Sequence, residues 1–165
     1  PNLHAMIALL RDGFHPQSEG GSIELAGDGT PIIDYVINDY LWDGVRRSWL
    51  SMAEIQFAAG AKAVRASHVD SPWFTSWEEA KAGINALEFR SNAFTAGSAH
   101  CMGGLTMGED QTRCLVDSNG KYHHLDNLYV FDGSVFPTSI GANPQLSIYG
   151  MACKQANKLL ETLKA

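Results

Sequence analysis

The sequence predicts an α+β fold in which helices flank a largely antiparallel sheet. Three observations favour this class. Strand-like segments joined by short turns come first, segments with helical periodicity follow, and no β-α-β alternation runs along the chain. The 165 residues are enough for one domain, or for one domain with an extension.

The N-terminal third is expected to consist of strands. An apolar run at 6–10 ends at Arg11-Asp12-Gly13, and residues 21–26 alternate polar and apolar side chains. The Asp-Gly turn at 27–31 tolerates positive φ, and the β-branched segment 32–37 supplies a partner strand. A connection this short predicts an antiparallel hairpin.

Two helices are expected next. Apolar residues recur every three to four positions over 41–59, and Gly60 follows where positive φ carries little steric cost. A short strand is expected at 62–66. Ser76-Trp77-Glu78-Glu79 fits a capping box that opens a helix ending near Leu87.

The C-terminal half predicts short strands and one long helix. A strand leading into a tight loop is expected at 93–106, and the segments 115–116 and 128–131 flank a turn at 117–120. An amphipathic helix is expected over 145–163. Its predicted apolar face consists of Tyr149, Ala152, Cys153, Ala156, Leu159, Leu160 and Leu163.

Composition excludes several classes of protein. The 18 acidic and 12 basic residues give a formal charge of −6, which argues against nucleic acid as the main partner because phosphate binding needs a basic surface. No apolar stretch approaches the roughly 20 residues of a transmembrane helix. The three cysteines form no even disulfide framework. Neither a Gly-x-Gly-x-x-Gly nor a Gly-x-x-x-x-Gly-Lys nucleotide motif is present.

One candidate functional segment is 98–108, in which His100 precedes Gly103-Gly104 and Gly108. Glycines at this density indicate sharp turns or close approach of the backbone to another group. His100 is then either a structural histidine buried on a glycine-rich turn or a functional imidazole. A thiol–imidazole pair with Cys101 is disfavoured, because adjacent residues on an extended strand point to opposite faces.

A second candidate segment is 127–148. Its strand ends in Asp132-Gly133-Ser134, and Asn143-Pro144 opens the last helix. The simple interpretation is that Asn143 caps this helix and Pro144 takes the first helical position. The functional interpretation adds that a helix N-terminus favours negative charge nearby.

A metal site built from His100, Cys101 and either His123 or His124 is a third hypothesis, although we expect no metal. Adjacent histidine side chains diverge, and no cysteine or acid stands at ligand spacing from His123-His124. A solvated turn is the better interpretation of that pair.

The two candidate segments together resemble the C-terminal region of the glucose–methanol–choline (GMC) oxidoreductases, which are FAD-dependent alcohol oxidases and dehydrogenases. The resemblance is strongest from His100 to Leu163 and looser before it. It rests on the order of His-x-x-Gly-Gly, Met-Gly, Val-Asp, Asn-Leu-Tyr-Val-x-Asp-Gly-Ser-x-x-Pro and Gly-x-Asn-Pro, followed by an amphipathic helix. Each motif alone is weak, but their order and spacing are specific.

The resemblance implies roles for particular residues. His100 and Asn143 would face the flavin, and Asp132-Gly133 would meet the ribityl and pyrophosphate of FAD. The backbone around Asn143, Pro144 and Gln145 would approach the pyrimidine edge of the flavin. Residues 1–110 would form part of the substrate-binding domain, and residues 111–165 would form a segment that contacts the FAD domain.

These residue types suit alcohol oxidation. Hydride passes to the flavin, and the hydroxyl proton needs a base such as imidazole, whose unperturbed pKa is near 6.5. Asn143 can hydrogen-bond the substrate oxygen without competing for the proton. The sequence does not decide whether Asn143 can both cap the helix and bind substrate.

Two features depart from the family pattern. Gly103-Gly104 stands where many relatives have Gly-Thr, and Leu105 stands where cysteine is frequent. Neither change affects the proposed base.

The FAD-binding half and its glycine-rich fingerprint are also missing from this sequence. The chain starts at Pro1 and runs straight into an apolar segment, so we expect a piece of a longer protein. In isolation it should be inactive and bind FAD weakly or not at all. Its uncovered apolar faces would be exposed or repacked, and could drive self-association.

The expected partners are the missing FAD-binding half and a small-molecule alcohol, with a lean toward apolar alcohols or sterols. The alternative is a non-enzymatic α+β binding module that reuses the same fold.

Overall fold

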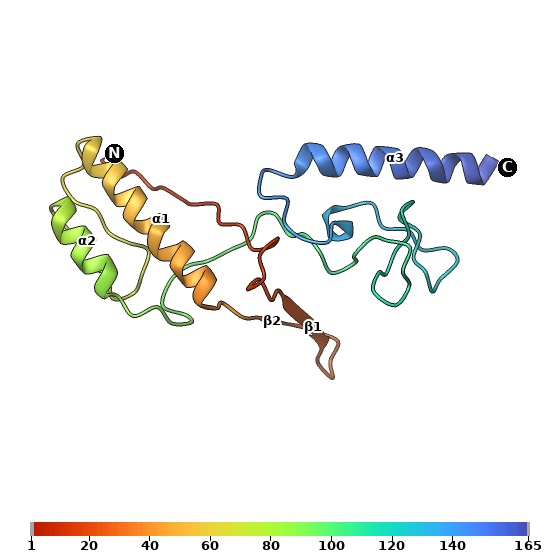
Figure 1. Ribbon diagram of the computed structural model, residues 1–165, viewed down its shortest axis with the longest axis horizontal. Helices are drawn as coiled ribbons and strands as arrows, with labels where there is room; N and C mark the ends of the chain where they lie inside the picture. Colours follow the sequence, from red (N-terminus) through yellow and green to blue (C-terminus); the bar gives the residue numbers. More distant parts are fainter. Residues whose placement is uncertain (1, 165) are drawn as a thin grey trace. The chain divides into compact units, whose positions relative to one another are not determined.

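The computed structural model describes residues 2–164 and divides into two compact units (Figure 1). The first unit comprises 2–10 and 16–97 and contains β1, β2, α1 and α2. The second unit comprises 11–15 and 98–164 and contains the short 3₁₀ helix η1 and α3. Strands and helices segregate along the chain, so the predicted α+β class is confirmed.

Strands β1 (Gly21–Leu25) and β2 (Pro31–Tyr35) form the predicted antiparallel hairpin, with Ile23 opposite Ile33. The turn is held by Asp28 Oδ1, which accepts a hydrogen bond from Thr30 N at 2.9 Å. Every residue of both strands is exposed. Within the described residues this hairpin is the whole sheet, whereas the sequence predicted further strands.

Helix α1 (Asp39–Ala58) begins two residues before its predicted start. Asn38 caps it, because Asn38 Oδ1 accepts a hydrogen bond from Leu41 N at 3.3 Å. Its buried residues are Val45, Trp49 and Ala53. Ile55, predicted to lie on the same face, is 55% exposed, because six residues of helix rotate it well away from Trp49.

Helix α2 (Trp77–Ala86) confirms the predicted start, because Ser76 Oγ accepts a hydrogen bond from Glu79 N. The Glu79 carboxylate turns back to Thr75 and accepts hydrogen bonds from its N–H and its hydroxyl, both at 2.9 Å. Ala80 and Ile84 pack into the core with Phe74 and the buried face of α1. Figure 1 shows these two helices side by side.

Several predicted strands are wrong as regular elements. The run 6–10 forms no strand, and the expected strand 62–66 is reduced to one bridge between Val64 and Phe74. The segments 93–106, 115–116 and 128–131 contribute only isolated bridges. A regular strand needs a partner that pairs with it over several residues, and the residue types within a short segment do not reveal whether such a partner exists.

Helix α3 (Gln145–Lys164) follows its predicted range closely. Its buried residue is Gln155. Tyr149, Leu160 and Leu163 on the predicted apolar face are exposed. Within residues 2–164, no helix has both the length and the apolar character needed to cross a bilayer.

Candidate functional site

The two candidate segments run together within the second unit. Leu105 N donates to Ser134 O at 3.1 Å, and Met107 N donates to Val135 O at 3.0 Å. The segment that follows His100 is therefore tied to the segment that contains Asp132 and Gly133. Spacing in the sequence does not reveal this pairing.

Gly133 marks the point where three parts of the unit converge. It is buried, and a Cβ built on it would lie 2.9 Å from Cys101 O and 3.1 Å from Ile148 Cδ1. Cys101 follows His100, and Ile148 belongs to the first turn of α3, shortly after Asn143. The structure thus brings the chain around His100, Gly133 and the start of α3 to one place.

Asp132 has a structural role in this convergence. It is the N-cap of η1 (Gly133–Val135), and its Oδ1 accepts a hydrogen bond from Ser134 N at 2.8 Å and another from the Ser134 hydroxyl. An aspartate cap fixes the backbone direction at the start of a helix. The Asp132 side chain therefore orients Gly133 at the convergence.

His100 lies half-buried on an irregular segment. Within the described chain, its imidazole makes no hydrogen bond. The glycines after it adopt positive φ, +83° at Gly103 and +92° at Gly104, and a Cβ on Gly104 would meet only open space. A structural histidine in a core would be expected to have a hydrogen-bond partner, and His100 has none in the described chain; its functional role stays a prediction.

The interpretation of Asn143 as the helix cap is wrong. Helix α3 begins at Gln145, and Ile148 N donates to Pro144 O at 2.9 Å, so Pro144 takes the cap position. Asn143 precedes the cap, is exposed, and makes no hydrogen bond to another residue of 2–164. Its carboxamide is therefore not occupied by capping, and its role in binding stays a prediction.

The remaining predicted residues lie at the same helix start. Pro144 is buried, and Gln145 is exposed with its Nε2 donating to Tyr149 Oη. The first turn of α3 contains no acidic residue. Its N–H groups, left without a side-chain cap in the described chain, supply the partial positive charge of a helix N-terminus.

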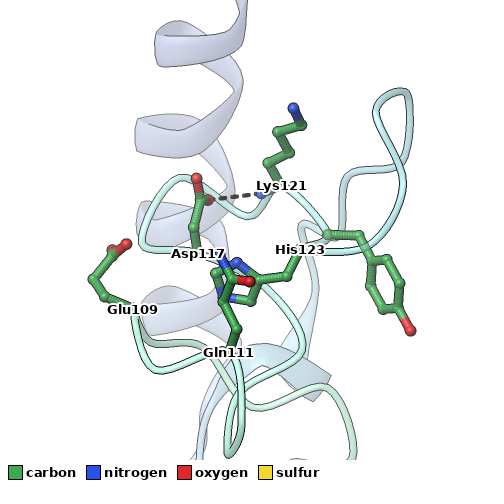
Figure 2. Close-up of a pocket in the computed structure, with 6 residues that line it drawn as sticks. Glu109, Gln111, Asp117, Lys121 and His123 are labelled. Atoms are coloured by element: carbon green, nitrogen blue, oxygen red, sulfur yellow. Dashed lines mark hydrogen bonds between the residues drawn. The ribbon is translucent and has the colours of Figure 1, made fainter.

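A separate open pocket of about 290 Å³ lies elsewhere in this unit (Figure 2). Its lining residues are Glu109, Gln111, Asp117, Lys121, Tyr122 and His123. His123 was considered only as a possible metal ligand, and none of the six belongs to the predicted catalytic or FAD-binding residues.

Local turns already use the polar groups of this pocket. Asp117 Oδ1 accepts from Lys121 N at 2.9 Å, the bond dashed in Figure 2. Glu109 accepts from Ser118 N at 3.1 Å, and the hydroxyl and N–H of Ser118 hold the pKa of Glu109 below its ordinary value. The pocket is best explained as the concave side of a set of turns.

Among residues 2–164, no three His, Cys, Asp or Glu side chains converge in a way that could hold a metal ion. The rings of His123 and His124 lie 6.4 Å apart at 63°. His123 Nε2 is instead 2.9 Å from Gly108 O, where it serves the turn.

One segment of this unit, residues 11–14, carries no functional motif in the sequence. Residues 11–14 lie against the loop 138–141 that precedes Asn143. The glycine at position 13 indicates a turn, but no local pattern reveals what a turn contacts at the far end of the chain.

The comparisons with known proteins agree on one family. A family model described as GMC oxidoreductase matches residues 16–152. An uncharacterized GMC-type oxidoreductase, y4nJ of Sinorhizobium fredii, is 29% identical over 89% of this chain and 29% of its own length. Long-chain-alcohol oxidase FAO4A of Arabidopsis thaliana is 26% identical over 96% of this chain and 22% of its own.

A third relative matches a shorter stretch. The 6'''-hydroxyparomomycin C oxidase of Streptomyces lividus is 37% identical over 51% of this chain and 15% of its own length. The chain therefore spans less than a third of the length of each of these curated relatives.

Proposed function

Because the chain belongs to the GMC oxidoreductase family, we propose that it is the C-terminal catalytic and substrate-binding region of an FAD-dependent enzyme that oxidises alcohols. The observation that carries this proposal is that two polar side chains without a hydrogen-bond partner belong to segments that meet at one place. The imidazole of His100 and the carboxamide of Asn143 have no hydrogen-bond partner within 2–164, and they belong to the two chain segments that meet at Gly133.

In the proposed reaction, a ring nitrogen of His100 accepts the hydroxyl proton of the alcohol. Asn143 Nδ2 donates a hydrogen bond to the alcohol oxygen and holds it against His100. FAD, when bound, supplies the acceptor for the hydride that leaves the carbon. Holding the reacting groups in one geometry removes much of the entropic barrier, so Asn143 contributes by orientation and His100 by proton transfer.

The residues around the convergence fit a flavin. The uncapped first turn of α3 directs N–H donors and partial positive charge outward, which suits the electron-rich edge of a reduced flavin. Asn143, Pro144 and Gln145 would hold that edge. Asp132 and Gly133 would meet the ribityl and pyrophosphate portion, where the absence of a side chain on Gly133 allows close approach.

The proposed substrate class is defined by the alcohol group. Two relatives are named for oxidising a long-chain alcohol and a hydroxyparomomycin, so the shared feature is the hydroxyl and not the remainder of the molecule. We further propose that the isolated chain turns over no alcohol. Its absorbance spectrum after FAD is added and the excess removed should lack a flavin band.

The test uses the full-length, flavin-loaded protein and follows bleaching of the flavin by alcohol under anaerobic conditions. We expect His100→Ala and His100→Gln to slow reduction by about 10²–10⁴-fold while flavin stays bound. Asn143→Ala should slow it less. The exposed His124, in the same unit, offers a matched control, and His124→Ala should reduce at the wild-type rate. Wild-type reduction in His100→Ala would overturn the proposal.

A further inference from the structure

The loop that carries Asn143 has few anchors of its own. Among the described residues, the hydrogen bond within this loop is a local one, from Gly141 N to Ser139 Oγ at 3.3 Å. The Asn143 side chain does not cap α3, so capping does not fix its position. Some other contact must hold the loop if Asn143 is to orient a substrate.

Gly13 provides one such contact. It is buried at φ +139°, and a Cβ built on it would overlap Thr138 Oγ1 and lie 3.4 Å from Ser139 N. A separation this small leaves room for no side chain at position 13. The backbone at Gly13 is therefore in direct contact with Thr138 and Ser139, where the loop begins.

Arg11 provides a second contact at the other end of the loop. A Cβ built on Gly141, which has φ +72°, would lie 2.6 Å from Arg11 Cδ and 2.9 Å from Arg11 Nη1. The Arg11 side chain thus lies across the backbone of Gly141, two residues before Asn143. Its guanidinium carbon also lies 5.5 Å from the centre of the Phe14 ring, in cation–π geometry.

Phe14 itself adopts an unfavourable conformation. Its φ of +54° is rare for a bulky residue, and it directly follows Gly13 at positive φ. Such conformations persist when surrounding contacts require them, and they cluster at functional sites. In this bent segment Arg11 meets the Phe14 ring, while Gly13 contacts the loop.

We propose that Arg11 and Gly13 are positioning residues that hold the loop 138–143 and thereby place the Asn143 carboxamide for the reaction. This inference rests on the proposed function of Asn143 and extends it to a segment far away in the sequence. Small displacements of an orienting group lower turnover strongly, so loss of either contact should affect kcat more than KM.

The test uses the full-length protein and four variants: Arg11→Ala, Arg11→Lys, Asn143→Ala and the double variant. We expect Arg11→Ala to lower kcat roughly 10-fold with little change in KM. Arg11→Lys retains the aliphatic contact with Gly141 and should restore part of kcat. The double variant should equal Asn143→Ala, because a displaced orienting group has no further effect once that group is gone. Arg113→Ala, an exposed arginine of the same unit, is the control.

A second readout does not depend on activity. Hydrogen exchange at the amides of 138–143 should be faster in Arg11→Ala than in the wild type, while the amides of α3 beyond its first turn stay unchanged. Two results would overturn this inference but not the proposed function. One is unchanged exchange in this loop, and the other is an equal loss of kcat from Arg11→Ala in the presence and absence of Asn143. Wild-type turnover in Asn143→Ala would overturn the proposed role of Asn143 and this inference with it.

Discussion

Gly83, in the middle of α2, offers a sharp test of the packing in the first unit. Replacing a glycine inside a helix by alanine normally stabilises the helix by about 1 kcal/mol. At Gly83 the new Cβ would lie 2.5 Å from Phe74 Cζ, closer still to Cε1, and 3.2 Å from Cδ1. Carbon atoms in contact prefer about 3.5–4.0 Å, so the ring or the helix must move by roughly 1 Å.

Phe74 has little freedom to move. Its side chain is 5% exposed, and its backbone is fastened to Val64 by two hydrogen bonds of 2.8 and 2.9 Å. Overpacking of a well-filled core costs about 1–3 kcal/mol, and an overlap of roughly 1 Å with a fixed ring puts Gly83→Ala near the upper end of that range, above the gain of about 1 kcal/mol in helix propensity. We therefore expect Gly83→Ala to lower the free energy of unfolding by about 1–2 kcal/mol.

The matched control is Gly44, inside α1 of the same unit. A Cβ at Gly44 would lie 3.7 and 3.8 Å from the methyl carbons of Leu10, which is ordinary contact. Gly44→Ala should therefore raise stability by up to about 1 kcal/mol. Urea unfolding followed by tryptophan fluorescence measures both variants, since all four tryptophans lie in this unit. A Gly83→Ala variant as stable as Gly44→Ala would refute the argument.

Two further predictions concern polar groups. The N–H and hydroxyl of Thr75 hold the pKa of Glu79 below its ordinary value of 4.5. The stabilising effect of the Glu79 carboxylate is therefore present above pH 4.5 and is lost as pH falls through the lowered pKa. Glu79→Gln should thus lower the urea midpoint at pH 7 and have little effect near pH 3; an equal effect at both pH values would contradict this. Gln155 is 1% exposed, and its Oε1 has no partner in the described chain, so Gln155→Met should stabilise the protein by about 1 kcal/mol in calorimetry. A loss of stability there would indicate that the oxygen is satisfied.

Elements defined by neighbouring residues could be predicted. The Ser76 cap and the Asp28 turn depend on side chains that reach backbone groups two or three residues away. The predicted strands at 6–10 and 62–66 failed for a related reason. Their composition suits a strand, but a strand also needs a distant partner, and no regular partner strand pairs with them in the described chain.

For the candidate site too, the sequence predicted one part correctly and another part wrongly. The order of motifs from His100 to Asn143 indicated the family, because motif spacing is a property of the chain itself. The residue type favoured Asn143 as a cap, a one-residue error that bears on the proposed role of Asn143. Helix starts are uncertain by a residue or two whenever a proline follows a good capping residue.

The sequence by itself determined the α+β class, the helix ranges, the hairpin and the family, because these depend on local periodicity, turn residues and motif order. Only the tertiary structure decided that Asn143 is released from capping, that Gly133 joins the chain around His100 to α3, and that Arg11 and Gly13 lie on the loop 138–141. The physical reason is distance along the chain. Contacts between remote segments depend on which shapes fit together after collapse, and no local pattern specifies that fit.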